Sequence, residues 1–130
     1  MSLEIAAVSV PAGTVVCHVK HLPEHRGTAA LVDGIPVALF RTQDDHVYAV
    51  QQLDPYSGAH VISRGIVGWR NGRPTVASPM YRQVFDLGTG QCLDPAGKEP
   101  RTLETYAVQV QDGIVTVGPP LSSPGIRAHP

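Results

Sequence analysis

The chain has 130 residues, the size of a single domain, and 42% of them are hydrophobic. Its ten basic and eleven acidic residues give a formal net charge of −1, which gives no electrostatic reason to expect binding to nucleic acid or to an anionic membrane. No apolar run approaches the roughly 20 residues that cross a bilayer, and the first residues lack the pattern of a secretory signal. The two cysteines, Cys17 and Cys92, are therefore expected to stay reduced. These features predict a cytoplasmic protein that binds neither nucleic acid nor membrane.

Short β-strands are predicted along the whole chain. Thirteen Gly and twelve Pro are spread through the sequence, which is typical of many turns. Segments rich in β-branched or alternating apolar residues predict about nine strands, at residues 14–19, 28–32, 36–41, 46–51, 66–69, 73–78, 84–86, 106–111 and 114–117. Asp33-Gly34, Asn71-Gly72 and Asp112-Gly113 are hairpin signals between neighbouring strands. We expect an all-β sandwich or small barrel over residues 1–118 and a flexible C-terminal tail at residues 119–130.

Two loops interrupt the strands and define a loop subdomain at about residues 53–92. The first loop, about fourteen residues long, contains Asp54-Pro55-Tyr56, and the second begins with Ser78-Pro79-Met80-Tyr81. A loop as long as the first is typical of a functional segment. The second loop leads into Phe85-Asp86 and then into the turn Thr89-Gly90. This frame resembles a Rieske domain, which has Cys-x-His in its first loop and Cys-x-x-His in its second. The resemblance implies a Rieske-like fold.

The four positions that match the Rieske ligands do not carry ligand side chains. A Rieske cluster is held by two Cys thiolates and two His imidazoles. Here the corresponding positions are Asp54, Tyr56, Ser78 and Tyr81. We therefore expect neither a [2Fe–2S] cluster nor another metal in this chain. Instead, the two phenol rings and the oxygens of Asp54 and Ser78 are expected to fill the space between the loops and to hydrogen-bond across it.

The sequence, including the positions at which it departs from the Rieske pattern, is similar to a known family. This family is the small subunit of bacterial assimilatory NAD(P)H-dependent nitrite reductase. The similarity covers about residues 14–117 and is carried by the segments 26–32, 37–41, 54–59, 63–68, 76–81 and 85–93. It implies a subunit without an active site of its own. It also implies a large catalytic subunit as partner, which carries FAD, an iron–sulfur cluster and sirohaem and reduces nitrite to ammonium. The chain would then be part of an oxidoreductase complex.

Four Arg and Trp residues in or near the loops form the candidate partner interface. Trp and Arg are enriched among the residues that dominate binding energies at interfaces. Arg64 and Arg82 lie within the two loops, and Trp69 and Arg70 stand beside the turn Asn71-Gly72. For Trp69, packing on a neighbouring strand is an equally good interpretation.

The cysteines and histidines allow two further hypotheses, and both are disfavoured. Cys17-His18-x-x-His21-x-x-x-His25 has the composition of a zinc site. However, adjacent residues of a strand point to opposite faces, so Cys17 and His18 could not bind one ion without a bulge. No local signature of a Cys–His hydrolase surrounds Cys17 or Cys92.

Two alternative functions remain beside the small-subunit interpretation. The first is a Rieske-type ferredoxin that carries electrons to an oxygenase, which would need the four missing ligands. The second is a clusterless adaptor that uses the same scaffold to bind another enzyme.

Overall fold

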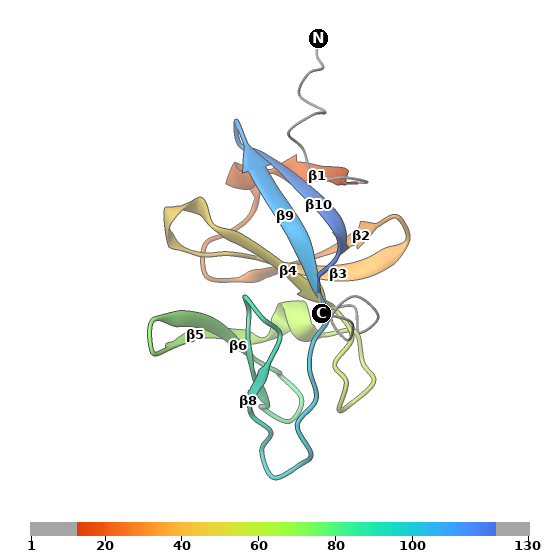
Figure 1. The fold of residues 1–130 in the computed structure, drawn as a ribbon, viewed down its shortest axis with the longest axis vertical. Coiled ribbons are helices and arrows are strands. Elements are labelled where there is room, and N and C mark those ends of the chain that lie inside the picture. The colour runs from red at the N-terminus through yellow and green to blue at the C-terminus, as the bar shows by residue number, and fades with distance from the viewer. Residues whose placement is uncertain (1–12, 122–130) are drawn as a thin grey trace, which may run out of the picture.

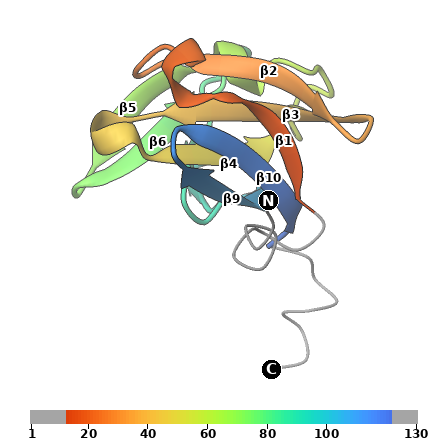
Figure 2. The same cartoon turned by 90° about the horizontal axis from the view of Figure 1, so that it is seen from above.

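The computed structural model describes residues 13–121, and over this range the protein is built from two antiparallel sheets (Figure 1). The larger sheet has six strands in the order β1-β10-β9-β4-β3-β2. Their bounds are β1 Thr14–His18, β2 Gly27–Val32, β3 Ile35–Arg41, β4 Val47–Gln51, β9 Thr105–Gln111 and β10 Ile114–Pro120. Seen from above, the sheet curls so that it is nearly closed (Figure 2). The prediction of an all-β barrel-like fold is confirmed.

The smaller sheet has four strands in the order β5-β6-β7-β8 and lies below the larger one in Figure 1. Its bounds are β5 Ile66–Arg70, β6 Arg73–Ala77, β7 Val84–Asp86 and β8 Cys92–Asp94. Strand β8 was not among the predicted strands, because three residues after a Gly-rich turn give no alternating pattern. Three short 3₁₀ helices connect strands: η1 Val19–His21, η2 Gln43–Asp45 and η3 Ile62–Arg64.

The three predicted hairpin turns are confirmed, and their backbone explains the residue choice. Asp33-Gly34, Asn71-Gly72 and Asp112-Gly113 each have two successive residues with positive φ, between 52° and 81°. Two positive φ angles define the turn whose twist matches antiparallel strands, and Asn, Asp and Gly adopt them at the lowest cost. These turns fix the pairing of β2 with β3, β5 with β6, and β9 with β10.

Strand β3 contributes to two hydrophobic cores because its side chains alternate. Val37 and Leu39 lie in the core enclosed by the six-stranded sheet, together with Val32, Ala49, Val115 and Val117. Ala38 and Phe40 face the other way and pack in a second core with Ile62, Val76, Phe85, Leu87 and Leu103. The second core therefore joins the larger sheet to the smaller one, and it fixes the position of the loops.

The end of the domain lies beyond the predicted boundary. Strand β10 continues through Pro119 and Pro120, and the N–H of Leu121 donates to the carbonyl of Thr105 at 2.7 Å. The predicted tail is therefore wrong for residues 119–121, and its remainder, residues 122–130, lies outside the described residues. Residues 1–12 of the predicted domain also lie outside them.

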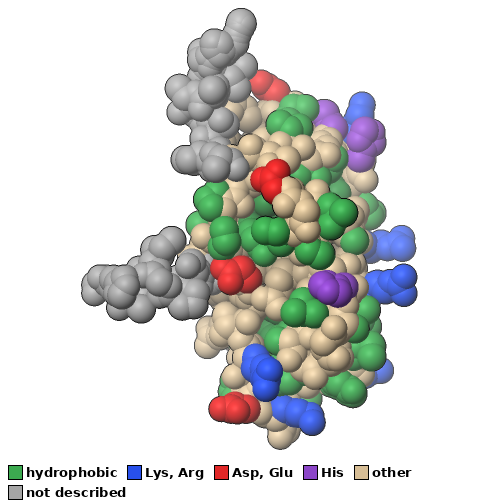
Figure 3. All heavy atoms as spheres, turned by 90° about the vertical axis from the view of Figure 1, so that its right-hand side faces the viewer, with side chains coloured by type: hydrophobic (Ala, Val, Ile, Leu, Met, Phe, Trp, Pro, Cys, Tyr) green, Lys and Arg blue, Asp and Glu red, His purple; other side chains and the backbone are tan. Residues whose placement is uncertain are grey.

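The described part of the chain carries charges of both signs on its surface (Figure 3) and has no helix that could span a membrane. Between residues 13 and 121, no helix is long and apolar enough to cross a membrane. One face of the molecule carries hydrophobic side chains mixed with charges of both signs (Figure 3). This mixture matches the formal net charge of −1.

Candidate functional site

The two loops meet through a buried hydrogen bond between Asp54 and Ser78. The Ser78 hydroxyl donates to Oδ2 of Asp54 at 2.6 Å, and both residues are excluded from solvent, with exposed fractions of 1% and 0%. Hydrogen bonds to carboxylates are strong, and a buried partner left alone is costly. The structure thus brings together two of the four candidate positions, 24 residues apart in the sequence.

Each member of this pair also shapes its own loop. Oδ1 of Asp54 accepts the N–H of Tyr56 at 2.9 Å, while the backbone of Asp54 bonds to Ala59 and to Gly58 at 2.8 Å each. In the second loop, the Ser78 hydroxyl accepts the N–H of Met80 at 3.1 Å. Short side chains with oxygen acceptors stabilise such turns by imitating a backbone carbonyl. The pair therefore holds two tight turns against one another.

Tyr56 ties the first loop to a third segment, the connection between β8 and β9. Its hydroxyl donates to the carbonyl of Glu99 at 2.7 Å and accepts the N–H of Arg101 at 2.8 Å. The Arg101 guanidinium lies 5.7 Å from the centre of the Tyr56 ring, which is a cation–π distance. Partial burial and a contact with the Cys92 thiol at 3.6 Å raise the pKa of Tyr56 above its ordinary value. The phenol is therefore protonated at neutral pH and available as a donor.

Tyr81, the fourth candidate position, does not fill the space between the loops. Its side chain is 52% exposed, and its neighbour Met80 is 47% exposed. The expectation that both phenol rings occupy that space is wrong for Tyr81. The reason is the turn that Ser78 forms with Met80 and Arg82, which directs this part of the loop toward solvent.

The four predicted interface residues are all exposed, but they do not form one group. Arg64 and Arg82 line a common groove of about 400 Å³. Arg70 lines a separate polar hollow and lies 4.0 Å from Asp94. Trp69 is 45% exposed at the end of β5, opposite Pro74 of β6, so it is neither fully packed nor free.

An ion pair between Arg73 and Asp86 fixes the turn after β7. Arg73 donates to both oxygens of Asp86, with the shorter contact at 2.5 Å, and the N–H groups of Gly88 and Thr89 donate to Oδ1. Burial of the Asp86 carboxyl disfavours its ionisation. The Arg73 hydrogen bond and the two N–H donors outweigh burial, so the pKa of Asp86 lies below its ordinary value. The carboxylate stabilises the turn that precedes β8.

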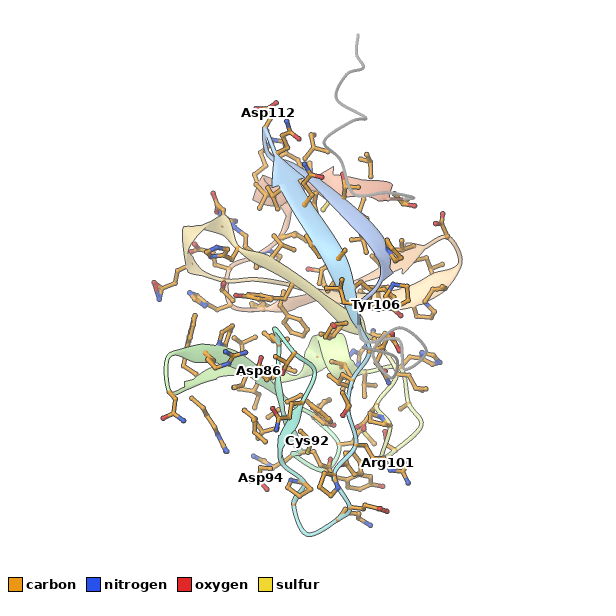
Figure 4. All side chains as sticks on the ribbon, in the orientation of Figure 1. Asp86, Cys92, Asp94, Arg101, Tyr106 and Asp112 are labelled. Carbon is orange, nitrogen blue, oxygen red and sulfur yellow. The ribbon has the colours of Figure 1, made fainter. Side chains whose placement is uncertain are left out.

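The cysteines do not form a metal centre with the neighbouring histidines in the described part of the chain. Cys17 packs against the first core, and burial raises the pKa of its thiol. Among residues 13–121, no three His, Cys, Asp or Glu side chains are grouped as they would be around an ion. The Cys92 thiol lies beside Tyr56, in the lower half of the molecule together with Arg101 (Figure 4).

Sequence reasoning missed several residues that hold the loops in place. Gln52 pairs with Ser63 through two hydrogen bonds of 2.9 and 2.7 Å, which attach η3 to the end of β4. Gln83 is fully buried, and its backbone carbonyl accepts the N–H of Ser78 at 2.8 Å. Neither polar atom of its side chain has a hydrogen-bond partner among residues 13–121. No local pattern marks these residues, since their roles depend on contacts between distant segments.

The fold and the two facing loops define the class of protein. The family described as the Rieske-like [2Fe-2S] domain matches residues 14–118, and the chain belongs to this family. The ferredoxin of carbazole 1,9a-dioxygenase from Nocardioides aromaticivorans shares the fold with a TM-score of 0.71 and 25% identity, covering 85% of this chain and 99% of the ferredoxin.

Nitrite reductase small subunits are more similar, and the chain is a member of that group. The NADH nitrite reductase small subunit of Salmonella typhimurium is 35% identical over 101 residues, which cover 77% of this chain and 91% of the relative. A solved Mycobacterium tuberculosis structure, assigned as an NADH-dependent nitrite reductase small subunit, has a TM-score of 0.74 and 44% identity, covering 81% of this chain and 92% of that one. A nitrite reductase large subunit from Klebsiella oxytoca is 38% identical over 103 residues, 79% of this chain but 10% of the relative.

Proposed function

We propose that this chain is a non-catalytic subunit that binds the large subunit of an assimilatory NAD(P)H-dependent nitrite reductase in the cytoplasm. In this role it stabilises the large subunit or positions its domains, while that subunit holds FAD, an iron–sulfur cluster and sirohaem and reduces nitrite to ammonium. The observation that carries the proposal is the buried hydrogen bond between Asp54 and Ser78. It joins the loops at the positions where the Rieske resemblance would place metal ligands.

The residues at these positions do not fit a [2Fe–2S] cluster. The cluster needs two thiolates and two imidazoles. Both carboxylate oxygens of Asp54 accept hydrogen bonds from the protein, and the Tyr56 hydroxyl is engaged by Glu99 and Arg101. Ser78 would have to lose its proton and its bond to Asp54 before it could bind iron. We therefore derive no electron-transfer step through a cluster in this chain.

The match to the Klebsiella large subunit supports the identity of the partner. In that protein, a segment similar to this chain occupies 10% of a single polypeptide named as the large subunit. A covalent link between two domains gives them a high effective concentration toward each other. The same pair is therefore expected to associate where the two parts are separate chains.

Co-expression with the large subunit from the same genome tests the proposal. The tagged full chain is expected to retain the large subunit in a fixed ratio on an affinity column and in size-exclusion chromatography. The purified small chain alone should reduce no nitrite with NADH or NADPH. A large subunit that elutes separately from the tagged chain would contradict the proposed assembly. Retention of an oxygenase and not of the large subunit would favour the ferredoxin or adaptor alternatives.

A further inference from the structure

One groove on the smaller sheet combines an aliphatic floor with two arginines. The groove has a volume of about 400 Å³. Ile66, Ala77 and Val84 occupy paired positions on β5, β6 and β7, so their side chains lie side by side on one face of the sheet and form the floor. Arg64, at the end of η3, and Arg82, in the second loop, line the same groove.

The floor of the groove is unusually open for an aliphatic surface. Ile66 is 66% exposed, and Met80 and Tyr81, which are neighbours in sequence of the groove residues, are each about half exposed. Apolar side chains grouped at a surface and bordered by cations are typical of a protein–protein contact. A small inorganic anion would leave this floor in contact with water.

The two arginines have no counter-charge in the described part of the chain. Arg41, Arg70 and Arg73 each lie within 4.0 Å of an aspartate, whereas neither Arg64 nor Arg82 forms such a pair among residues 13–121. Among residues 13–121, no acidic side chain lines the groove. An occupant with a carboxylate would therefore find two unpaired guanidinium groups, which bind carboxylates in a planar, bidentate geometry.

The backbone of Arg82 gives a second reason to assign it a binding role. Its φ is 65°, in the left-handed region that favours glycine. The turn is imposed by the bonds between Ser78 and Gln83 and between Arg82 and Ser78, at 2.8 and 3.1 Å. Seven non-glycine residues between residues 13 and 121 have a positive φ, and Arg82 is the one arginine among them; strain of this kind is found at functional sites.

We propose that this groove binds an acidic and aliphatic segment of the large subunit. One carboxylate of the segment lies between Arg64 and Arg82, and an aliphatic side chain next to it packs on Ile66. The inference rests on the proposed function, because it names the part of the partner that this surface recognises. Of the four predicted interface residues, only Arg64 and Arg82 belong to this binding site. Arg70 and Trp69 line no part of the groove.

Binding of the full chain to the purified large subunit tests the groove by titration calorimetry. Arg64→Gln and Arg82→Gly are each expected to weaken binding about tenfold, as for the loss of one hydrogen bond to a charged group. The double variant should lose less than the product of the two, since both arginines contact one carboxylate. Ile66→Thr should weaken binding severalfold. Arg26→Gln, which removes the same charge from an exposed arginine outside the groove, should bind as the wild type.

These variants distinguish a loss of binding at the groove from a loss of folding and from a failure of the proposed function. Arg82→Gly relieves the backbone strain, so its melting temperature should be unchanged or higher while its affinity falls. If the wild type does not bind the large subunit at all, the proposed function fails. If the wild type binds and both arginine variants bind equally well, the groove proposal is overturned and the proposed function stands. Inorganic phosphate that shifts the NMR signals of both guanidinium groups at millimolar concentration without weakening binding of the large subunit would assign the groove to a free anion and also overturn it.

Discussion

The six-stranded sheet and the loop subdomain are stabilised in different ways. The larger sheet is held by regular strand pairing and by an apolar core of Val, Leu and Ala side chains. The loops below it are joined by polar side chains: Asp54 to Ser78, Tyr56 to Glu99 and Arg101, and Gln52 to Ser63. In a domain that binds metal, coordination supplies such cross-links between loops. The difference indicates that polar side-chain contacts can hold two facing loops together when an apolar core anchors their bases.

Phe40→Ala should have the largest effect, because Phe40 lies in the core that joins the two regions. Removal of a fully buried Phe side chain is expected to lower the free energy of unfolding by about 4 kcal/mol. Urea unfolding followed by circular dichroism reports mainly the larger sheet, which has more strand residues, and fluorescence of the single tryptophan, Trp69, reports the smaller one. Both transitions should shift together. Val15→Ala, at an exposed position, serves as the control.

Different unfolding transitions by circular dichroism and by fluorescence would contradict the coupling of the two sheets. A fluorescence transition that shifts while circular dichroism does not would mean that the smaller sheet unfolds independently. The shared core would then not couple the two regions.

Asp54→Ala should have the next largest effect. It leaves the Ser78 hydroxyl and the Tyr56 N–H without their acceptor in a buried site, at an expected cost of about 3 kcal/mol. Asp45→Asn is the control, because it removes the charge of an aspartate whose pair with Arg41 is exposed and worth less than about 1 kcal/mol, and Asn tolerates the positive φ of 56° at this position. Chemical denaturation measures both. Equal losses for the two variants would contradict a structural role for the buried pair.

The sequence predicted the fold well because its signals are local. Asn71-Gly72 and the other hairpin turns specify neighbouring strands, and nine of the ten strands follow from alternation and turn residues. Strand β8 is too short to show a pattern. The two proline residues at the end of β10 predict a tail by composition, although Pro is tolerated at a strand end.

The candidate site was predictable only in part, since its geometry depends on contacts between distant segments. The Rieske-like spacing identified Asp54 and Ser78, which the structure brings together. It could not show that Tyr56 reaches Glu99 and Arg101, 43 and 45 residues away, or that Tyr81 points outward. Residue types at matching positions indicate which groups are present but not which way the turn directs them.

Tyr56→Phe should have a smaller effect, about 1 kcal/mol, because it removes one hydroxyl that accepts and donates a hydrogen bond at a partly exposed site. Amide hydrogen exchange at Arg101 should become faster in this variant. Tyr81→Phe is the matched control, since the Tyr81 hydroxyl has no hydrogen-bond partner among residues 13–121 and its loss should change neither stability nor exchange. Protection of Arg101 that persists in Tyr56→Phe would show that the third segment is held by other contacts.

The smallest expected effect is the dependence of folding stability on pH through Asp86. The folded-state pKa of Asp86 lies below its ordinary value, so the stabilisation by this group is complete above the usual carboxyl range near pH 4 and is lost as the pH falls through the lowered pKa. The stability difference between the wild type and Asp86→Asn should therefore be constant above about pH 5 and shrink below about pH 4. Thermal melts between pH 3 and 7 measure it. Parallel curves over the whole range would contradict the assigned shift.

The most direct test of the account is the iron and acid-labile sulfide content of the full chain, purified without oxygen from cells supplied with iron. If a hydrogen bond between Asp54 and Ser78 occupies the place of a metal centre, the protein will be colourless, with iron and sulfide no higher than in a metal-free control protein. Two iron and two sulfide per chain, with visible absorbance, would contradict it.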